Sequence, residues 1–215
     1  MSILLITSSP RGSASHSTRI ATELAHRLEA ADPEATLTVR DLAANPLPHI
    51  DSDYSAGIYT PPEKRSDRQA ELVGVSDEAV DQLFAADTII LATGLINFNI
   101  SSTLKSWIDH VARAGRTFSY GKDGPKGLVT GKKVYVVLAS GGVYSEGPAI
   151  QLDHAIPYLR HMLAFIGLTD VEVIRVEGVG MGPEATDAAL KKATDRVNAL
   201  ALASRTSGLG AAVAA

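Results

Sequence analysis

The chain has 215 residues, of which 45% are hydrophobic and 20% are charged, as in ordinary globular domains rather than disordered segments. Twenty-four Asp and Glu residues against 20 Lys and Arg residues give a net charge of −4, which argues against nucleic-acid binding because such domains present a basic face. Cysteine is absent, so disulfides, a thiolate nucleophile and Cys-ligated zinc or iron–sulfur clusters are excluded.

We expect no targeting signal at the start of the chain. Its apolar run, residues 3–6, has no basic segment before it and is too short for the core of a signal peptide. No later segment approaches the ~20 apolar residues that a membrane span needs. We therefore expect a cytoplasmic protein with no membrane segment.

Apolar runs and helical spacings alternate along the sequence. Strands are predicted at residues 3–6, 36–39, 88–92, 134–138 and 171–174, and the continuous apolar run at residues 3–6 is typical of a strand buried on both faces. Apolar residues three or four apart predict helices at residues 15–31, 101–114, 156–166 and 183–203. This alternation predicts an α/β fold, a doubly wound five-stranded parallel sheet with strand order 2-1-3-4-5.

Two stretches interrupt the alternation. Residues 42–65 contain Pro46, Pro48, Pro61 and Pro62 and predict a long ordered loop, a kind of segment that often covers a site. Residues 116–133 are glycine-rich and indicate a hairpin beside the sheet. We expect one domain over residues 1–205 and a frayed tail over residues 206–215.

Three segments follow strands whose carboxyl ends should meet at one edge of the sheet, where such folds bind ligands. In residues 8–17, hydroxyls and free N–H groups at a helix N-terminus suit a monoester phosphate. This segment is neither a G-x-G-x-x-G fingerprint nor a P-loop, and a solvated cap that binds nothing remains an equal alternative. Residues 94–101 and 139–147 could embrace a flat ring or form plain turns. The conjunction of the three segments favours a ligand site.

Other chemistry-bearing residues are interpreted as structural. Histidines 26, 49, 110, 154 and 161 show no metal-binding spacing, so no metal is expected. Trp107 shares a helical stripe with Leu104 and Val111, which predicts core packing or a dimer face.

Several motifs together resemble the FMN-dependent NADH-azoreductase and NAD(P)H:quinone oxidoreductase family. They are RDLAANP at residues 40–46, NFNIS at 97–101, VARAG at 111–115, GLVTGKK at 127–133 and FIG at 165–167. The resemblance extends from Ile3 to about Val197. It implies a flavodoxin-like fold, one FMN per subunit, and a homodimer with active sites at the subunit boundary.

The same resemblance assigns site residues by position. Ser9, Ser15, His16 and Ser17 would hold the FMN phosphate. The isoalloxazine ring would lie between two loops, formed by Leu95, Ile96, Asn97 and Phe98 and by Ala139, Ser140, Gly141 and Gly142. The substrate side would carry Tyr59, from the 54–59 loop, together with Tyr120 and Tyr144.

The implied reaction is a ping-pong transfer of two electrons from NADH or NADPH, through N5 of FMN, to a quinone or an azo compound. The flavin carries the chemistry, so no catalytic side chain is expected; backbone N–H groups of Asn97, Phe98, Gly141 and Gly142 would stabilise its reduced form. The family's usual residues are replaced at Gly94–Ile96 and at Ala139–Ser140, which puts substrate identity in question. The alternatives are a flavodoxin-type electron carrier and a binding protein that has lost the flavin.

Overall fold

The protein is described by a computed structural model that covers the backbone of residues 1–213 and the side chains of residues 1–204. Its main sheet has five parallel strands in the order β2-β1-β3-β6-β7, which confirms the predicted 2-1-3-4-5 arrangement. The strands are β1 (Ser2–Thr7), β2 (Thr36–Asp41), β3 (Thr88–Gly94), β6 (Lys133–Ser140) and β7 (Asp170–Glu177).

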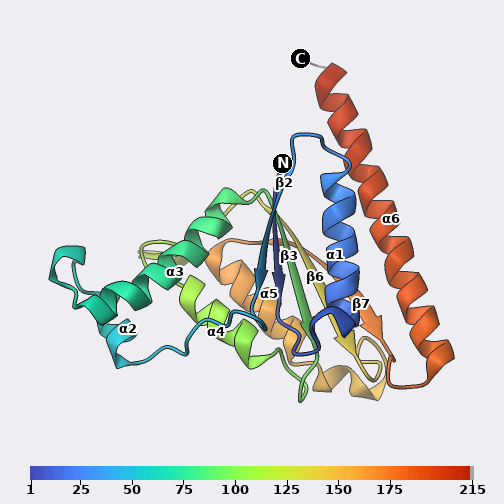
Figure 1. The fold of residues 1–215 in the computed structure, drawn as a ribbon, viewed down its shortest axis with the longest axis horizontal. Coiled ribbons are helices and arrows are strands. Elements are labelled where there is room, and N and C mark those ends of the chain that lie inside the picture. Colours follow the sequence, from blue (N-terminus) through green and yellow to red (C-terminus); the bar gives the residue numbers. More distant parts are fainter. Residues whose placement is uncertain (214–215) are drawn as a thin grey trace.

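Helices cover both faces of this sheet (Figure 1). Helices α1 (His16–Glu29) and α6 (Pro183–Val213) pack on one face, over the side chains of Ile3 and Leu5. Helices α3 (Asp67–Ala85), α4 (Ser102–Val111) and α5 (Ala155–Ile166) lie on the other face, where Leu4 and Ile6 point. Successive strand residues face opposite sides, so a continuous apolar run is buried by both layers.

Serine caps fix the start of two helices at the carboxyl edge of the sheet. The Ser15 hydroxyl accepts a hydrogen bond from the N–H of Thr18 at 3.4 Å, and α1 begins at the next residue. The Ser101 hydroxyl accepts from the N–H of Leu104 at 3.2 Å at the start of α4. A capped N-terminus keeps further N–H groups without helical partners, so both helices present hydrogen-bond donors at this edge.

The region between β2 and β3 departs from the prediction. Residues 42–65 include helix α2 (Ser52–Gly57) and a 3-10 turn (Pro62–Lys64), and helix α3 was not predicted at all. The buried side of α3 carries Leu72, Ala79 and Leu83 but also Ser76, and Gly74 lies within the helix. These small and polar residues weaken the apolar stripe by which such a helix is recognised.

The remaining elements match more closely. Strands β4 (Phe118–Gly121) and β5 (Gly124–Gly127) form the predicted antiparallel hairpin. Trp107 is buried in the core as expected. Helix α6 continues to Val213, past the predicted end near residue 203 and into the segment expected to fray, of which residues 214 and 215 lie outside the described residues. Among the described residues, no helix has the length and apolar character to cross a membrane.

Candidate functional site

The three predicted ligand segments meet at the carboxyl edge of the sheet and are joined by hydrogen bonds. The N–H of Leu95 donates to the carbonyl oxygen of Ala139 at 2.8 Å, which links the segments after β3 and β6. A fourth segment, after β7, joins them: the N–H of Val179 donates to Ser140 at 3.2 Å, and that of Gly180 to Gly141 at 2.9 Å. The first segment is tied to β3, because the N–H of Ser8 donates to the carbonyl oxygen of Ala92 at 3.0 Å.

A cavity of about 310 Å³ lies between these loops. Eight of the predicted cofactor residues line it: Ser9, Ser15, His16, Leu95, Ile96, Ala139, Ser140 and Gly141. Five residues outside the predicted set complete the lining: Pro10, Arg11, Gly94, Val179 and Gly180. The cavity thus runs from the N-terminus of α1 to the gap between the β3 and β6 loops.

The α1 end of this cavity has the properties of an anion site. The N–H groups of His16 and Ser17 donate to no other residue in the described part of the chain. Burial, followed by the charges of Arg19 and Arg11, lowers the pKa of His16, so that its imidazole is neutral at pH 7. The guanidinium-bearing Arg11 also lines the cavity here. Free helix N–H groups beside a guanidinium favour a phosphate.

The side chain of Ser17 contributes to this end indirectly. It is completely buried and does not line the cavity. Its hydroxyl lies 3.0 Å from that of Ser15, which does line the cavity and also caps α1. Ser17 therefore orients the Ser15 hydroxyl.

The other end of the cavity is bounded by a strained two-residue turn. Ile96 and Asn99 exchange backbone hydrogen bonds of 2.8 and 3.0 Å, and the two residues between them have positive φ, +47° at Asn97 and +67° at Phe98. Such a turn requires positive φ at both central positions, a conformation that non-glycine residues adopt at a cost of about 1–3 kcal/mol each. Strain of this kind concentrates at ligand-binding sites.

Unpaired backbone donors flank the same gap. Within the described part of the chain, the N–H groups of Asn97, Phe98, Gly141 and Gly142 donate no hydrogen bond. A side-chain carbon added at Gly141 would meet no atom within 4 Å, so open space lies beside this backbone. Four unpaired donors from two facing loops suit acceptor atoms on the edge of a bound ring.

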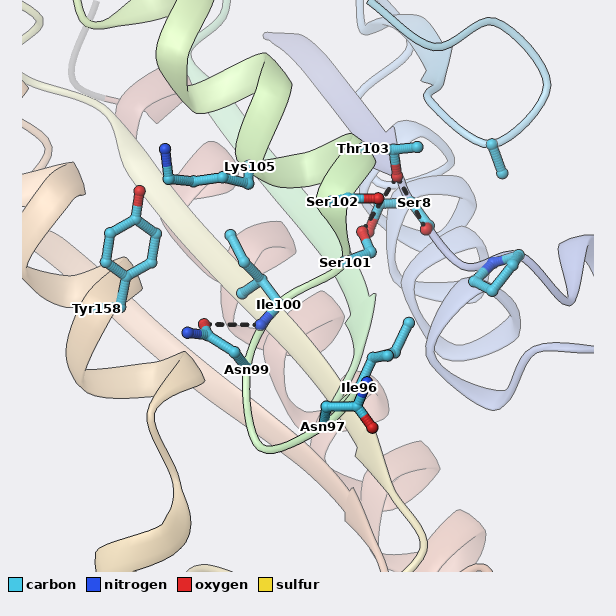
Figure 2. Close-up of a pocket in the computed structure, with 12 residues that line it drawn as sticks. Ser8, Ile96, Asn97, Asn99, Ile100, Ser101, Ser102, Thr103, Lys105 and Tyr158 are labelled. Carbon is cyan, nitrogen blue, oxygen red and sulfur yellow. Dashed lines mark hydrogen bonds between the residues drawn. The ribbon is translucent and has the colours of Figure 1, made fainter. Parts of the chain in front are cut away.

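A larger cavity of about 680 Å³ adjoins the turn and shares Pro10 and Ile96 with the smaller one (Figure 2). Its other residues are Ser8, Ala43, Asn97, Asn99, Ile100, Ser101, Ser102, Thr103, Lys105 and Tyr158. Figure 2 shows Lys105 and Tyr158 on the side of Ile100 away from Ser8. Lys105 Nζ is paired with Asp109 at 2.6 Å, and burial, the largest cause, raises the pKa of Tyr158.

The remaining predicted residues lie outside the two cavities. The rings of Phe98 and Tyr144 meet edge to face at 6.2 Å, and Gly142 lies against the Tyr144 ring. Tyr59 and Tyr120 are 79% and 75% exposed and line neither cavity. Tyr54 is buried, with its hydroxyl 3.3 Å from that of Ser76. Of the 42–65 segment, Ala43 lines the larger cavity.

Some lining residues had a signal in the sequence. Gly178, Gly180 and Gly182 alternate just after β7, as expected where backbone approaches a ligand or a neighbouring loop. No sequence pattern marked Lys105 and Tyr158 as lining residues, because they lie on different helices and only the packing of α4 against α5 brings them together. No group of three metal-ligating side chains occurs among the described residues.

The sequence matches, over residues 1–201, a family model described as having a flavodoxin-like fold, and the chain belongs to that family. The FMN-dependent NADH:quinone oxidoreductase of Mesorhizobium japonicum is 74% identical over 93% of this chain and 95% of its own length. The protein of that name from Herminiimonas arsenicoxydans is 50% identical over 92% of this chain and 97% of its own.

Solved structures agree with these relatives. Azoreductase AzrA superposes with a TM-score of 0.86 at 28% identity, covering 96% of this chain and 100% of that one. An azoreductase from Bacillus anthracis str. Sterne gives a TM-score of 0.84 at 28% identity with the same coverage. The resemblance to azoreductases and quinone reductases that the motifs indicated is therefore confirmed.

Proposed function

We propose that this protein is an FMN-dependent oxidoreductase that transfers two electrons from NADH to quinones and also reduces aromatic azo compounds. The observation that carries this proposal is the shape of the smaller cavity. It joins a phosphate-suited helix N-terminus to a gap between the β3 and β6 loops, and these two loops carry four unpaired backbone N–H groups, of which that of Gly141 belongs to a lining residue. The relatives are named FMN-dependent NADH:quinone oxidoreductase, and this name supports FMN as the cofactor and NADH as the electron donor.

The residues fit FMN from end to end. The N–H groups of His16 and Ser17, the Ser15 hydroxyl and Arg11 would hold the phosphate. The backbone at Leu95–Phe98 and Ala139–Gly142 would hold the ring, and Gly141 leaves the space that close approach requires.

When bound, FMN supplies hydride acceptance from a nicotinamide and two-electron transfer to an acceptor. The protein's part is to position the ring and to place N–H donors where negative charge develops on it. The unpaired N–H groups of Asn97, Phe98, Gly141 and Gly142 are preorganised for that purpose, because their loops are already tied together by hydrogen bonds. No side-chain acid or base is needed.

The larger cavity gives the donor and the acceptor a common place to bind. It shares Pro10 and Ile96 with the smaller cavity, so a molecule within it would lie beside a ring bound there. Two substrates that use one place must bind in turn, and we therefore propose a ping-pong order. Initial rates at several fixed quinone concentrations should give parallel double-reciprocal lines, whereas intersecting lines would contradict it.

We also propose that the protein acts as a homodimer with its sites at the subunit boundary, as the family resemblance implies. Tyr59 and Tyr120 are 79% and 75% exposed, so both rings are available for contact with a second subunit. Light scattering of the FMN-loaded protein at micromolar concentration should give twice the chain mass of 22.6 kDa.

The cofactor and the activity are tested together. Purified protein is mixed with FMN, desalted and examined for the flavin absorption bands, and NADH oxidation is then followed with menadione, benzoquinone and an azo dye. We expect one FMN per chain and turnover with each acceptor. Bound FMN without turnover would identify an electron carrier instead, and the absence of a flavin band would identify a protein that does not bind FMN.

A further inference from the structure

A three-residue ion-pair network lies behind the two loops that flank the smaller cavity. Arg175 of β7 contacts Asp153 at 2.6 Å through one guanidinium nitrogen and Glu177 at 3.1 Å through the other. The two carboxylate side chains are only 4% and 11% exposed, and that of Arg175 is 23% exposed. Arg175 lines neither cavity, so any effect on a ligand must pass through its partners.

The Asp153 side of the network holds the strained turn. One Asp153 carboxylate oxygen accepts hydrogen bonds from the N–H groups of Ala155 and Ile156, both at 3.0 Å, at the start of α5. The adjacent N–H of His154 donates to the carbonyl oxygen of Phe98 at 3.0 Å. The position of Asp153 therefore determines where the Asn97–Phe98 turn is anchored.

The Glu177 side holds the glycine loop. One Glu177 oxygen accepts from the N–H of Tyr144 at 2.8 Å, and the other accepts from the Ser145 hydroxyl. The next residue, Gly178, donates its N–H to the carbonyl oxygen of Gly142 at 3.1 Å. Glu177 thus fixes the loop that carries the N–H groups of Gly141 and Gly142.

We propose that Arg175 is a positioning residue that sets the separation of the two ring-binding loops. Its guanidinium draws together two largely buried carboxylates, each of which anchors one loop. Without it, the two like charges would repel each other while poorly solvated, and the loops would move apart. This inference rests on the proposed binding of FMN between those loops.

The test compares R175M, E177Q and R175K with the exposed-pair control R196M, which breaks the Arg196–Glu172 contact between α6 and β7. Affinity for FMN is measured by fluorescence quenching on apoprotein, and the flavin midpoint potential on the loaded protein. We expect at least tenfold weaker FMN binding and a lower potential in R175M, partial recovery in R175K, and no change in R196M.

The pair R175M and E177Q separates positioning from a long-range charge effect. R175M removes a positive charge and E177Q removes a negative one, so a purely electrostatic effect on anionic FMN would change the affinity in opposite directions. Positioning predicts weaker binding in both. E177Q keeps an oxygen that accepts from the N–H of Tyr144, so it remains informative if R175M does not fold.

The outcomes distinguish this inference from the proposed function. If wild-type protein binds no FMN, the proposed function itself fails. If wild-type protein binds FMN and folded R175M binds it within twofold of wild type, the positioning role is overturned. Tighter FMN binding by E177Q than by wild type would also overturn the positioning role, because it would indicate a long-range charge effect.

Discussion

The imidazole of His110 is hydrogen-bonded to the backbone carbonyl of Pro48, with 2.9 Å between Nε2 and the oxygen. His110 is fully buried in α4, and its ring meets that of Tyr54 edge to face at 4.7 Å. A carbonyl oxygen only accepts, so Nε2 carries the proton. Nδ1 has no hydrogen-bond partner among the described residues, and a proton there would be buried without an acceptor. The contact ties the 42–65 segment to α4 in the neutral state of His110.

This contact predicts that stability decreases as the pH falls below the ordinary histidine pKa of about 6.5. Burial is the main cause that lowers the pKa of His110, so the unfolded chain takes up a proton before the folded chain does. The resulting loss is at most about 1.4 kcal/mol per pH unit for one group. Urea unfolding of the apoprotein at pH 7.5 and 5.5 should show a smaller pH effect in H110N. H26N, at an exposed histidine, is the control. An unaltered pH effect in H110N would show that His110 is not the group responsible.

The positive φ of Phe98 predicts an unusual order of stability among two variants. F98A loses the contact with Tyr144 but keeps a side-chain carbon in the left-handed region, which costs about 1–2 kcal/mol. F98G loses the same contact and also that strain. Urea unfolding of the apoprotein should therefore show F98G to be more stable than F98A by about 1 kcal/mol, although glycine is normally the less stable choice. The opposite order would show that the turn relaxes in these variants.

The α1 N-terminus predicts a charge-specific effect on FMN binding. S15D and S15N both retain a side chain suited to the N-cap that Ser15 provides, but only S15D places a carboxylate at the end of the cavity proposed to hold the phosphate. Two unit charges about 4 Å apart repel by about 1 to 4 kcal/mol, depending on solvent exposure. S15D should therefore bind FMN at least about tenfold more weakly than S15N in fluorescence titrations. Equal affinities would place the phosphate elsewhere.

The approach of Gly127 to Gly167 predicts a large effect of one methyl group. A side-chain carbon at Gly127 would lie 2.2 Å from the backbone nitrogen of Gly167, and backbone cannot give way as a flexible side chain can. G127A should lose about 1–3 kcal/mol of unfolding free energy and expose the hairpin that carries Tyr120 to faster tryptic cleavage. G121A, whose added carbon would find its nearest neighbour at 3.7 Å, is the matched control within the same hairpin. Similar stability of the two variants would contradict this packing.

The spacing of apolar residues along the sequence was sufficient to predict most of the strands and helices. Runs such as residues 89–92 and 134–138 are continuously hydrophobic, which is the pattern of a parallel strand covered on both faces. Helix α3 was missed for a physical reason: its buried side includes Ser76, whose hydroxyl is satisfied by the carbonyl oxygen of His110 at 2.6 Å. A polar residue that finds its partner on another helix does not look buried in the sequence.

The sequence by itself determined the sheet order and the edge at which ligand loops gather, because chain-local patterns and the handedness of crossovers specify both. It also indicated eight of the residues that line the smaller cavity. Only the tertiary structure decided that Lys105 and Tyr158 share a cavity and that the Ser17 side chain is buried. It likewise decided that Arg175 forms ion pairs with both Asp153 and Glu177. These relationships join residues on different elements, and their distances depend on how helices and strands pack rather than on any local pattern.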